Sequence, residues 1–329
     1  MTLRIGVLGA SRIAENAIIG PAAELGHRVV AVAARDRARA EVFAEKYGVE
    51  RVVDGYQDVI DDPEVDVVYN PLANALHAPW NLAAIAAGKP VLSEKPFARD
   101  ESEAHTVADA AEAAGVPVLE AFHYAFHPVT RRAFALAADG SIGDVTRVEV
   151  RMAMPPPDDG DPRWSLEMAG GALMDLGCYG MHVMRSLGRL GVPGVDGAPS
   201  VTVAVAEQRT PGIDAVCDVE VAFPGGATGV STNSMIAEDF SFTIAVIGTT
   251  GELLVHDFIR ANQDDRLTVR TPEGTSVERL GTRPSYVYQL EAFAAHVERG
   301  VPLPFGTADA VANMAMLDAA YRAAGMLPR

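Results

Sequence analysis

Three titratable side chains in the second half of the chain stand at a spacing that suits proton transfer. Asp175, Tyr179 and His182 occupy positions i, i+4 and i+7 of a small and apolar segment that opens at Gly170-Gly171. If this segment is a helix, all three side chains lie on one face of it. Because buried polar groups need partners, the pattern indicates either proton-transfer groups facing a substrate or an Asp–His network that locks the domain.

A lysine in the first half is the second candidate for chemistry. Lys95 follows the short apolar run at residues 90–92, which predicts a buried strand. Pro96 cannot extend a strand ladder and biases Lys95 away from helix, so the strand should end there. Open α/β sheets bind ligands at the carboxyl ends of their strands. For this stretch alone, a solvated lysine at a strand end is the alternative.

The elements that would position these groups begin with a strand, a turn and a helix. Residues 3–8 predict a short strand, and a helix-like stretch runs to about Leu25. Between them Gly9, Ser11 and Ala14 occupy the three small-residue positions of the dinucleotide motif, for the turn, the approach of a pyrophosphate and helix packing. Free N–H groups at the helix start would hold the phosphates. Since serine replaces the middle glycine, a plain strand-to-helix turn fits about as well.

The next strand, at residues 27–34, carries the signal for cofactor choice. Domains that prefer NAD place Asp or Glu near the end of this strand to bind the ribose hydroxyls. Here Ala34 is followed by Arg35, with Arg37 and Arg39 close behind. A cation without the acid favours a 2′-phosphate, so we predict NADP over NAD, with Arg35 as the main contact. A surface arginine cluster without a ligand is the alternative.

Strands and helices then alternate with short links, which indicates βαβ units up to about Ala121. Asn74 and His77 fall at a strand-to-helix switch, on the same edge as Lys95, and are predicted to contact cofactor or substrate. A helix cap or a core histidine is the alternative for His77. The aromatic segment at residues 122–128 either walls a crevice or packs an interface.

The second half reads as a sheet with a long loop before it. The loop at residues 155–162 is rich in proline and aspartate, so it cannot be helix or strand interior. Trp164 after it either shields a substrate as part of a lid or anchors the loop. Apolar alternation and turn signals predict a largely antiparallel meander, with one face covered by helices and the other left for a partner subunit. The predicted strands are residues 200–207, 215–223, 227–235 and 240–247, and the terminal helices are 284–299 and 307–324.

Composition limits the class of protein. A chain of 329 residues suits two domains, and 49% hydrophobic residues indicate a globular protein. The net charge of -17 argues against a nucleic-acid partner. Two cysteines, Cys178 and Cys217, are too few for a disulfide framework, and no spacing suggests a metal site. With no membrane-length apolar run and a strand starting by Leu3, we expect a cytoplasmic protein.

Taken together, these stretches resemble the Gfo/Idh/MocA family of nicotinamide-dependent oxidoreductases over nearly the whole chain. The turn at residues 6–14, Asn74 with His77, Glu94-Lys95-Pro96 and the segment at 175–179 fall in family order and spacing. Tyr179 stands where histidine is commoner. With tyrosine at this position, the chain resembles the subgroup that contains dimeric dihydrodiol dehydrogenase, NADP-dependent xylose dehydrogenase and glucose-fructose oxidoreductase. Membership of this subgroup implies NADP as the cofactor.

The resemblance implies an α/β fold in two domains: an N-terminal Rossmann domain with a doubly wound parallel sheet, and a C-terminal α+β domain with a large, mostly antiparallel open sheet. We expect them at residues 1–121 and 122–329, with the C-terminal helix able to pack back on the first domain. A homodimer or homotetramer through the C-terminal sheet is expected.

The patterns and the resemblance together predict a set of site residues without a metal. The predicted catalytic residues are Lys95, Tyr179 and Asp175. The predicted cofactor contacts are Gly9, Ala10, Ser11, Arg12, Ile13, Arg35, Arg39, Pro71, Leu72, Asn74, His77, Glu94 and Lys95. The predicted substrate contacts are Tyr124, Trp164, Asp175, Tyr179 and His182. Ser11 and Ala125 depart from the residues common in the family.

The reaction implied by the resemblance is hydride transfer between NADP, with NAD as the alternative, and a secondary alcohol, hemiacetal or ketone. The substrate would be a sugar, polyol or cyclic diol. Two other functions stay open: a ketosugar reductase in natural-product biosynthesis, and a non-catalytic NADPH-binding sensor.

Overall fold

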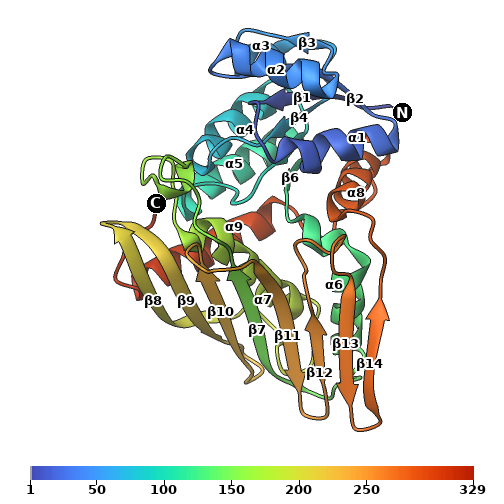
Figure 1. Ribbon diagram of the computed structural model, residues 1–329, viewed down its shortest axis with the longest axis vertical. Helices are drawn as coiled ribbons and strands as arrows, with labels where there is room; N and C mark the ends of the chain where they lie inside the picture. Colours follow the sequence, from blue (N-terminus) through green and yellow to red (C-terminus); the bar gives the residue numbers. More distant parts are fainter. Residues whose placement is uncertain (1) are drawn as a thin grey trace. The chain divides into compact units, whose positions relative to one another are not determined.

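The chain forms two compact units in the computed structural model, which describes residues 2–329 (Figure 1). The first unit takes in the residues up to His123 together with Tyr286–Ala312. The second consists of Tyr124–Ser285 and Asn313–Arg329. The domain border after Ala121 stays a prediction; the compact units divide after His123.

The first unit is built on a six-stranded parallel sheet with the order β3-β2-β1-β4-β5-β6. Its strands are buried apolar runs, as a parallel sheet covered on both faces requires. The order reverses between β1 and β4, and ligands of such sheets bind at the carboxyl ends of the strands beside this reversal. The strands are β1 Arg4–Leu8, β2 Arg28–Ala33, β3 Arg51–Val52, β4 Val67–Asn70, β5 Val91–Ser93 and β6 Val118–Glu120.

Local signals start and stop the helices of this unit. Asp36 accepts a hydrogen bond from the Ala38 amide at the start of α2, and Asp100 does the same for Glu103 in α5. Glycines with positive φ end both helices. The helices are α1 Gly20–Leu25, α2 Arg37–Tyr47, α3 Tyr56–Asp61, α4 His77–Ala86, α5 Glu101–Ala114 and α8 Ser285–Arg299, with a π-helical turn at Glu15–Ile19 and a 3-10 turn at Asn74–Leu76.

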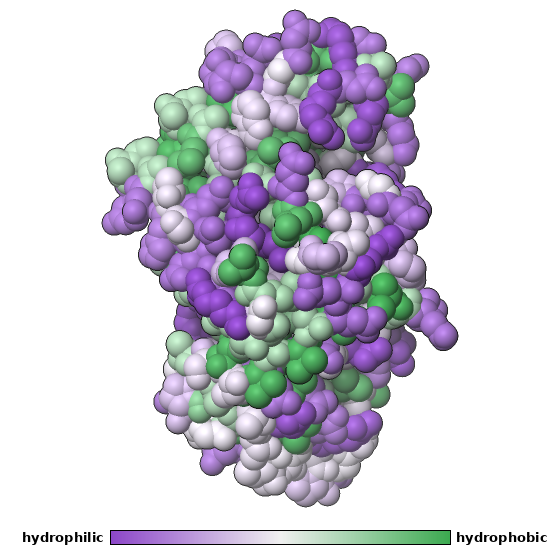
Figure 2. Space-filling view, turned by 90° about the vertical axis from the view of Figure 1, so that its left-hand side faces the viewer, coloured by the Kyte–Doolittle hydropathy of each residue, from purple (hydrophilic) through white to green (hydrophobic). Residues whose placement is uncertain are grey.

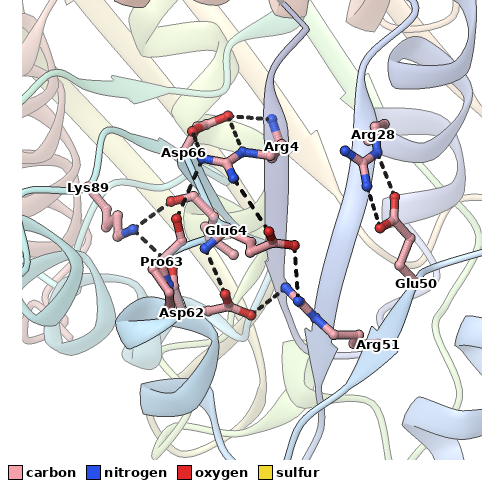
Figure 3. A network of polar contacts seen from close by, with 10 residues as sticks. Arg4, Arg28, Glu50, Arg51, Asp62, Pro63, Glu64, Asp66 and Lys89 are labelled. Carbon is pink, nitrogen blue, oxygen red and sulfur yellow. Dashed lines mark hydrogen bonds and ion pairs between the residues drawn. The ribbon is translucent and has the colours of Figure 1, made fainter.

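Ion pairs gather at the amino ends of the strands in this unit, away from the ligand edge (Figure 3). Arg4, at the start of β1, binds Asp66 through both its backbone amide (2.8 Å) and its guanidinium (2.7 Å). Arg51 pairs with Asp62 at 2.6 Å, and Lys89 donates to the Asp62 carbonyl at 3.1 Å. These contacts join the ends of the strands and the loops before them.

We expect Asp66→Asn to lower the free energy of unfolding by about 1 kcal/mol at pH 7, a modest loss because water screens the pair. The Arg4 hydrogen bond is the main cause that lowers the pKa of Asp66 in the folded chain. Its stabilisation is therefore complete above the unfolded-state pKa of about 3.9 and is lost as the pH falls through the lower folded-state value. Urea unfolding at pH 7 and in strong acid measures this.

The Glu50→Gln variant is the matched control, because Glu50 pairs with Arg28 in a more exposed place on the same sheet. Glu50→Gln should lower the free energy of unfolding by less than Asp66→Asn does. A difference between wild type and Asp66→Asn that persists undiminished in strong acid would contradict the assignment to the carboxylate.

The second unit contains an eight-stranded sheet with the order β14-β13-β12-β11-β7-β10-β9-β8. Every neighbouring pair is antiparallel except β7 with β10. Buried and half-buried residues alternate along β10 and β11, so one face packs and the other is more open. The strands are β7 Val145–Ala153, β8 Ser200–Thr210, β9 Ile213–Ala222, β10 Thr228–Ser234, β11 Ser241–Gly248, β12 Glu252–Val255, β13 Arg266–Thr271 and β14 Gly274–Arg279.

Helices α6 Pro128–Ala138 and α7 Cys178–Arg189 pack against one face of this sheet (Figure 1). The unit also contains the later part of α9 Thr307–Ala323, a π-helical turn at Leu173–Gly177, and 3-10 turns at His123–Phe126 and Pro162–Trp164. The two sheets confirm the predicted fold class.

On the face that Figure 2 displays, hydrophobic residues occur in small groups among hydrophilic ones. Among residues 2–329, no helix combines the length and the apolar character that crossing a bilayer requires. Within the same range, no group of three or more His, Cys, Asp or Glu side chains is arranged to hold a metal ion.

Candidate active site

The turn after β1 brings the chain close to two neighbouring segments. The Gly9 amide donates to the Ala33 carbonyl at the end of β2, at 2.7 Å. Gly9 has a φ of 97°, and a Cβ there would lie 2.9 Å from Leu72 Cδ2. Glycine is therefore required both by the backbone conformation and by the close contact with the loop after β4.

The turn leaves hydrogen-bond donors unused at the start of the first helical segment. In the part of the chain that the structure describes, neither the Ser11 amide nor the Ile13 amide donates to another group. The Ser11 hydroxyl oxygen is buried and also has no partner there. The π-helical turn Glu15–Ile19 and then α1 follow directly. Unused donors at a helix start fit the phosphates of a dinucleotide.

The arginine cluster after β2 separates into paired and unpaired side chains. Arg37 is neutralised by Glu41, at 3.0 Å, and by Asp54. Arg35 and Arg39 are exposed, and neither forms an ion pair with an acidic side chain among residues 2–329. The positive charge left by this cluster thus comes from Arg35 and Arg39, both of which are among the residues predicted to contact the cofactor.

A hollow of about 390 Å³ lies beside the turn and α2. It is lined by Ala10, Ser11, Arg12, Ala38, Arg39, Val42, Phe43, Lys46 and Tyr47. Arg39 Nη2 reaches the Ala10 carbonyl at 3.4 Å from one wall. The hollow therefore combines an apolar floor with cations next to the unused donors of Ser11.

A buried polar network fixes the strand ends on which Lys95 is mounted. Asn70, at the end of β4, donates to Asn81 Oδ1 at 2.8 Å, and Asn81 donates to Ser93 Oγ at 2.9 Å. All three side chains are fully buried. Ser93 ends β5, two residues before Lys95, whose peptide bond to Pro96 is cis. Satisfied buried networks rigidify their surroundings, so the backbone that carries Lys95 is held in a fixed position.

His77 supports two loops of this edge from inside. Its Nδ1 lies 2.7 Å from the Pro96 carbonyl oxygen and its Nε2 lies 2.8 Å from that of Leu72. Burial lowers the pKa of His77 to about 4; the two carbonyls oppose this shift, and the charge of Lys95 adds to it. The ring is therefore neutral at pH 7, and its single N–H can donate to only one of the two carbonyls.

The other predicted residues of the first unit lie on the same edge. Pro71, Leu72 and Asn74 form the loop between β4 and α4. Glu94 is buried after β5 and accepts a hydrogen bond from the Tyr69 hydroxyl at 2.9 Å. The structure thus gathers the predicted cofactor contacts at the carboxyl ends of β1, β2, β4 and β5.

In the second unit, the segment that carries Asp175 and Tyr179 is not one continuous α-helix. It begins with the π-helical turn Leu173–Gly177, in which the Cys178 amide donates to the Leu173 carbonyl, and α7 follows. The expectation of a regular i, i+4, i+7 face is therefore wrong at its first turn. Asp175 lies in the wider π-helical turn, whereas Tyr179 and His182 lie in the α-helix that follows. Such π turns are frequent at functional sites.

Asp175 is held by an arginine from the loop before it. Arg163 Nε donates to Asp175 Oδ2 at 2.7 Å, and Arg163 also pairs with Asp161 at 3.3 Å. Asp175 is 7% exposed. The two carboxylates raise the pKa of Arg163, with Asp175 the larger cause. The guanidinium thus compensates a nearly buried carboxylate four residues before Tyr179.

Tyr179 lies in a cluster of aromatic rings. Its centroid is 5.9 Å from that of Tyr124 and 6.2 Å from that of Phe258, both at edge-to-face angles. The Tyr124 hydroxyl and His182 Nδ1 are 2.6 Å apart, and both side chains are fully buried. His182 therefore stands behind Tyr124, and the rings of Tyr124 and Phe258 fix the orientation of the Tyr179 ring.

Trp164 makes the contacts of a loop anchor. Its indole N–H donates to the Pro157 carbonyl at 3.2 Å. The Arg209 guanidinium lies 4.4 Å from the centre of its ring and pairs with Asp159 of the same loop at 2.5 Å. Of the two interpretations left open by the sequence, these contacts favour the anchor.

Two family models match the chain. Residues 3–122 match the oxidoreductase family with an NAD-binding Rossmann fold, and residues 130–254 match the Gfo/Idh/MocA C-terminal domain. The D-xylose 1-dehydrogenase (NADP(+)) 2 of Haloferax volcanii is 32% identical over 98% of this chain and 97% of its own length. The chain belongs to the Gfo/Idh/MocA family.

Other members of the Gfo/Idh/MocA family are similar at comparable levels. The trans-1,2-dihydrobenzene-1,2-diol dehydrogenase of Mus musculus is 33% identical over 76% of this chain and 74% of its own length. The crystal structure of a 3-ketoreductase from Actinomadura kijaniata with NADP and TDP-benzene superposes with a TM-score of 0.87, at 26% identity, covering 98% of each chain. The predicted family is thereby confirmed, and with it an NAD(P)-binding oxidoreductase.

Two residues of this Gfo/Idh/MocA member escaped the sequence analysis. Neither Arg163 nor Phe258 was singled out there. A signal for Arg163 exists in Gly170-Gly171, because a Cβ on Gly170 would lie 2.3 Å from the Arg163 carbonyl oxygen. Such a glycine marks a close backbone approach. Nothing comparable in the sequence marks Phe258.

Proposed function

We propose that this chain is an NADP(H)-dependent oxidoreductase. It moves a hydride between nicotinamide and a carbon that is a secondary alcohol, hemiacetal or ketone of a sugar, polyol or cyclic diol. One observation carries the proposal: Lys95 and a turn with unused phosphate donors lie at the same edge of one parallel sheet. The dehydrogenases and the ketoreductase to which the chain is similar support the substrate class.

When bound, the cofactor supplies the hydride or accepts it. Tyr179 exchanges the proton of the reacting hydroxyl, Lys95 orients the reacting oxygen and offsets its developing negative charge, and Asp175 binds a substrate hydroxyl. Tyrosine ordinarily has a pKa of about 10, so in the reductive direction a phenol is already protonated. In the oxidative direction a nearby positive charge favours the phenolate.

NADP is proposed over NAD because Arg35 and Arg39 lie beside the phosphate turn and pair with no acidic side chain of the described residues 2–329. We expect the double variant Arg35→Ser, Arg39→Ser to raise KM for NADP by about 10- to 100-fold, because each charge-assisted hydrogen bond to a phosphate is lost. KM for NAD should stay nearly constant. Steady-state kinetics with both cofactors measures this.

Arg37→Ser is the matched control, since its guanidinium already pairs with Glu41 and Asp54. It should leave the cofactor preference unchanged. Equal or better turnover of the wild type with NAD would refute the NADP assignment.

The function itself is tested by a substrate panel. D-xylose and other aldoses, polyols and cyclic trans-diols are offered with NADP, and the absorbance of the reduced cofactor is followed. Turnover of at least one of these classes is the expected result. Tight NADPH binding with no turnover across the panel would instead favour the sensor.

A ketosugar reductase is the second candidate, favoured by the similarity to the Actinomadura kijaniata 3-ketoreductase over 98% of the chain. NADPH oxidation with a nucleotide-linked 3-ketosugar, and none of the activities of the panel above, would select it. Both candidates use the same proposed roles for Tyr179 and Lys95.

We also propose self-association through the open face of the second sheet, as a homodimer or homotetramer. Val203 and Val205 on β8 are 46% and 66% exposed, which leaves apolar surface on this sheet uncovered. Light scattering measures the mass in solution; a monomer at micromolar concentration would refute this part of the proposal.

A further inference from the structure

A fully buried ion pair lies beneath the start of the segment that carries Asp175 and Tyr179. The side chain of Arg329 is 1% exposed and that of Asp214 is 0% exposed, and they pair through Arg329 Nη2 and Asp214 Oδ1. Tyr321 completes the cluster, since its hydroxyl donates to Asp214 Oδ1 at 3.1 Å and its ring lies 4.0 Å from the Arg329 guanidinium carbon. Buried pairs of this kind tolerate the loss of one partner poorly.

This ion pair contacts the main chain at the start of the π-helical turn, at Gly170, Gly171 and Leu173. Asp214 Oδ2 accepts the Leu173 amide at 2.6 Å, which satisfies the first amide of the turn. Arg329 Nε donates to the Gly170 carbonyl at 2.8 Å. At Gly171 a Cβ would lie 2.1 Å from Asp214 Oδ1 and 2.6 Å from Arg329 Nη2, so only glycine fits between the pair.

The same backbone is tied to Arg163. The Gly171 amide donates to the Arg163 carbonyl at 2.9 Å, and the Asp175 amide donates to the Gly171 carbonyl at 3.0 Å. A shift of Gly171 is therefore transmitted directly to Asp175 and to the arginine that pairs with it. Tyr179 follows in the same helical segment.

We propose that Arg329 is a positioning residue, which sets the geometry of Asp175 and Tyr179 through Asp214 and the start of the π-helical turn. This inference rests on the proposed function. Without Arg329, Asp214 is a buried carboxylate with no cation, and it must bind a proton or admit water. Burial already raises the pKa of Asp214 and Arg329 is the largest influence that opposes the rise. Either response weakens the acceptor that holds the Leu173 amide.

The π-helical turn is the part that should respond. Its hydrogen bonds span five residues instead of the four of an α-helix, and its first amide is held by Asp214. Once that hold weakens, relaxation towards α-helical pairing rotates Asp175 relative to Tyr179. Misplacement of reacting groups by about 1 Å can cost on the order of 100-fold in rate.

The test is Arg329→Met, compared with the wild type well below the melting temperature of both. We expect kcat to fall by about 10- to 100-fold, while KM for NADP(H), bound by residues of the first unit, stays within about twofold. Amide hydrogen exchange should accelerate at residues 171–179 and stay unchanged in β1, β4 and β5. Exchange does not depend on turnover, so it tests the inference even if the proposed function fails.

Arg322→Met is the matched control. Arg322 lies on the same helix as Tyr321 and pairs with Asp318 at 3.4 Å, but 60% of its side chain is exposed. We expect wild-type kcat and wild-type exchange at 171–179. The control thus separates the loss of a cation on α9 from the loss of the buried pair.

Arg329→Lys keeps the positive charge but lacks the planar fork that reaches both Asp214 and Gly170. It should be intermediate in kcat and in exchange, and it decides the question if Arg329→Met does not fold. Wild-type kcat together with wild-type exchange in a folded Arg329 variant would overturn the proposal. So would a uniform rise in exchange over both units, which is the signature of lost global stability alone.

Discussion

Tyr179→Phe should lower kcat by about 10²- to 10⁴-fold, the usual contribution of a positioned proton donor or acceptor. The substitution removes one hydroxyl and keeps the ring. The edge-to-face contacts with Tyr124 and Phe258, at 5.9 and 6.2 Å, are therefore preserved. NADPH affinity should not change, because the proposed cofactor contacts lie in the first unit. Single-turnover kinetics and a fluorescence titration of NADPH measure the two quantities.

The same variant supplies its own control. Its melting temperature should equal that of the wild type within a few degrees, because the aromatic ring and its edge-to-face contacts are kept. Near-normal turnover would contradict the assignment and move the proton-transfer role to His182 or Lys95. His182 is the weaker of these, since its Nδ1 already lies 2.6 Å from the Tyr124 hydroxyl.

Lys95→Met is expected to have the second large effect, a fall in kcat of about 10²- to 10³-fold. The variant keeps most of the side-chain volume and removes the ammonium that offsets negative charge on the reacting oxygen. The strand end should not move, because Asn70, Asn81 and Ser93 hold it from below. Initial rates in the reductive direction, where Tyr179 needs no ionisation, isolate this effect.

A spectroscopic readout accompanies the kinetics. The charge of Lys95 is one cause of the low pKa of His77. In Lys95→Met the pKa of His77 should therefore rise from its value of about 4, and an NMR titration of the histidine rings follows this. An unchanged His77 pKa would show that the ammonium does not act at this edge of the sheet.

Lys89→Met is the matched control for Lys95. Lys89 lies just before the amino end of β5, where its ammonium donates to the carbonyls of Asp62 and Val65 at 3.1 and 2.5 Å. Its loss should lower stability and leave kcat unchanged. If both lysine variants reduced kcat equally, the effect would be one of folding and the role of Lys95 would be refuted.

The architecture could be predicted because its signals are local. The strand predicted at residues 27–34, apolar from residue 29 on, corresponds to β2, and Lys95 was placed by an apolar strand and a following proline. The carboxyl ends of parallel strands meet at one edge whatever the loops do. For that reason Gly9, Arg35, His77 and Lys95 could be assigned to one place without any contact being known.

What the sequence could not predict depends on contacts between distant residues. The arginine cluster was visible, but which arginines are neutralised depends on Asp54, which follows a different strand. The α-helical face of Asp175 and Tyr179 was wrong at its first turn, since the π-helical turn is held by Asp214, 41 residues after Leu173. Phe258 and Tyr179 are far apart in the sequence and come together only in the folded unit. No spacing between residues in the sequence predicts that contact.

The parallel sheet of the first unit has two rims, formed by the amino ends and the carboxyl ends of its strands, and they have different roles. The ion pairs of Arg4, Arg51 and Lys89 brace one rim, and the proposed nucleotide contacts occupy the other. Engineering of cofactor preference at Arg35 and Arg39 should therefore leave the thermal resistance of the unit intact. A library confined to that rim can be screened for new reductant usage without a prior round of stabilisation.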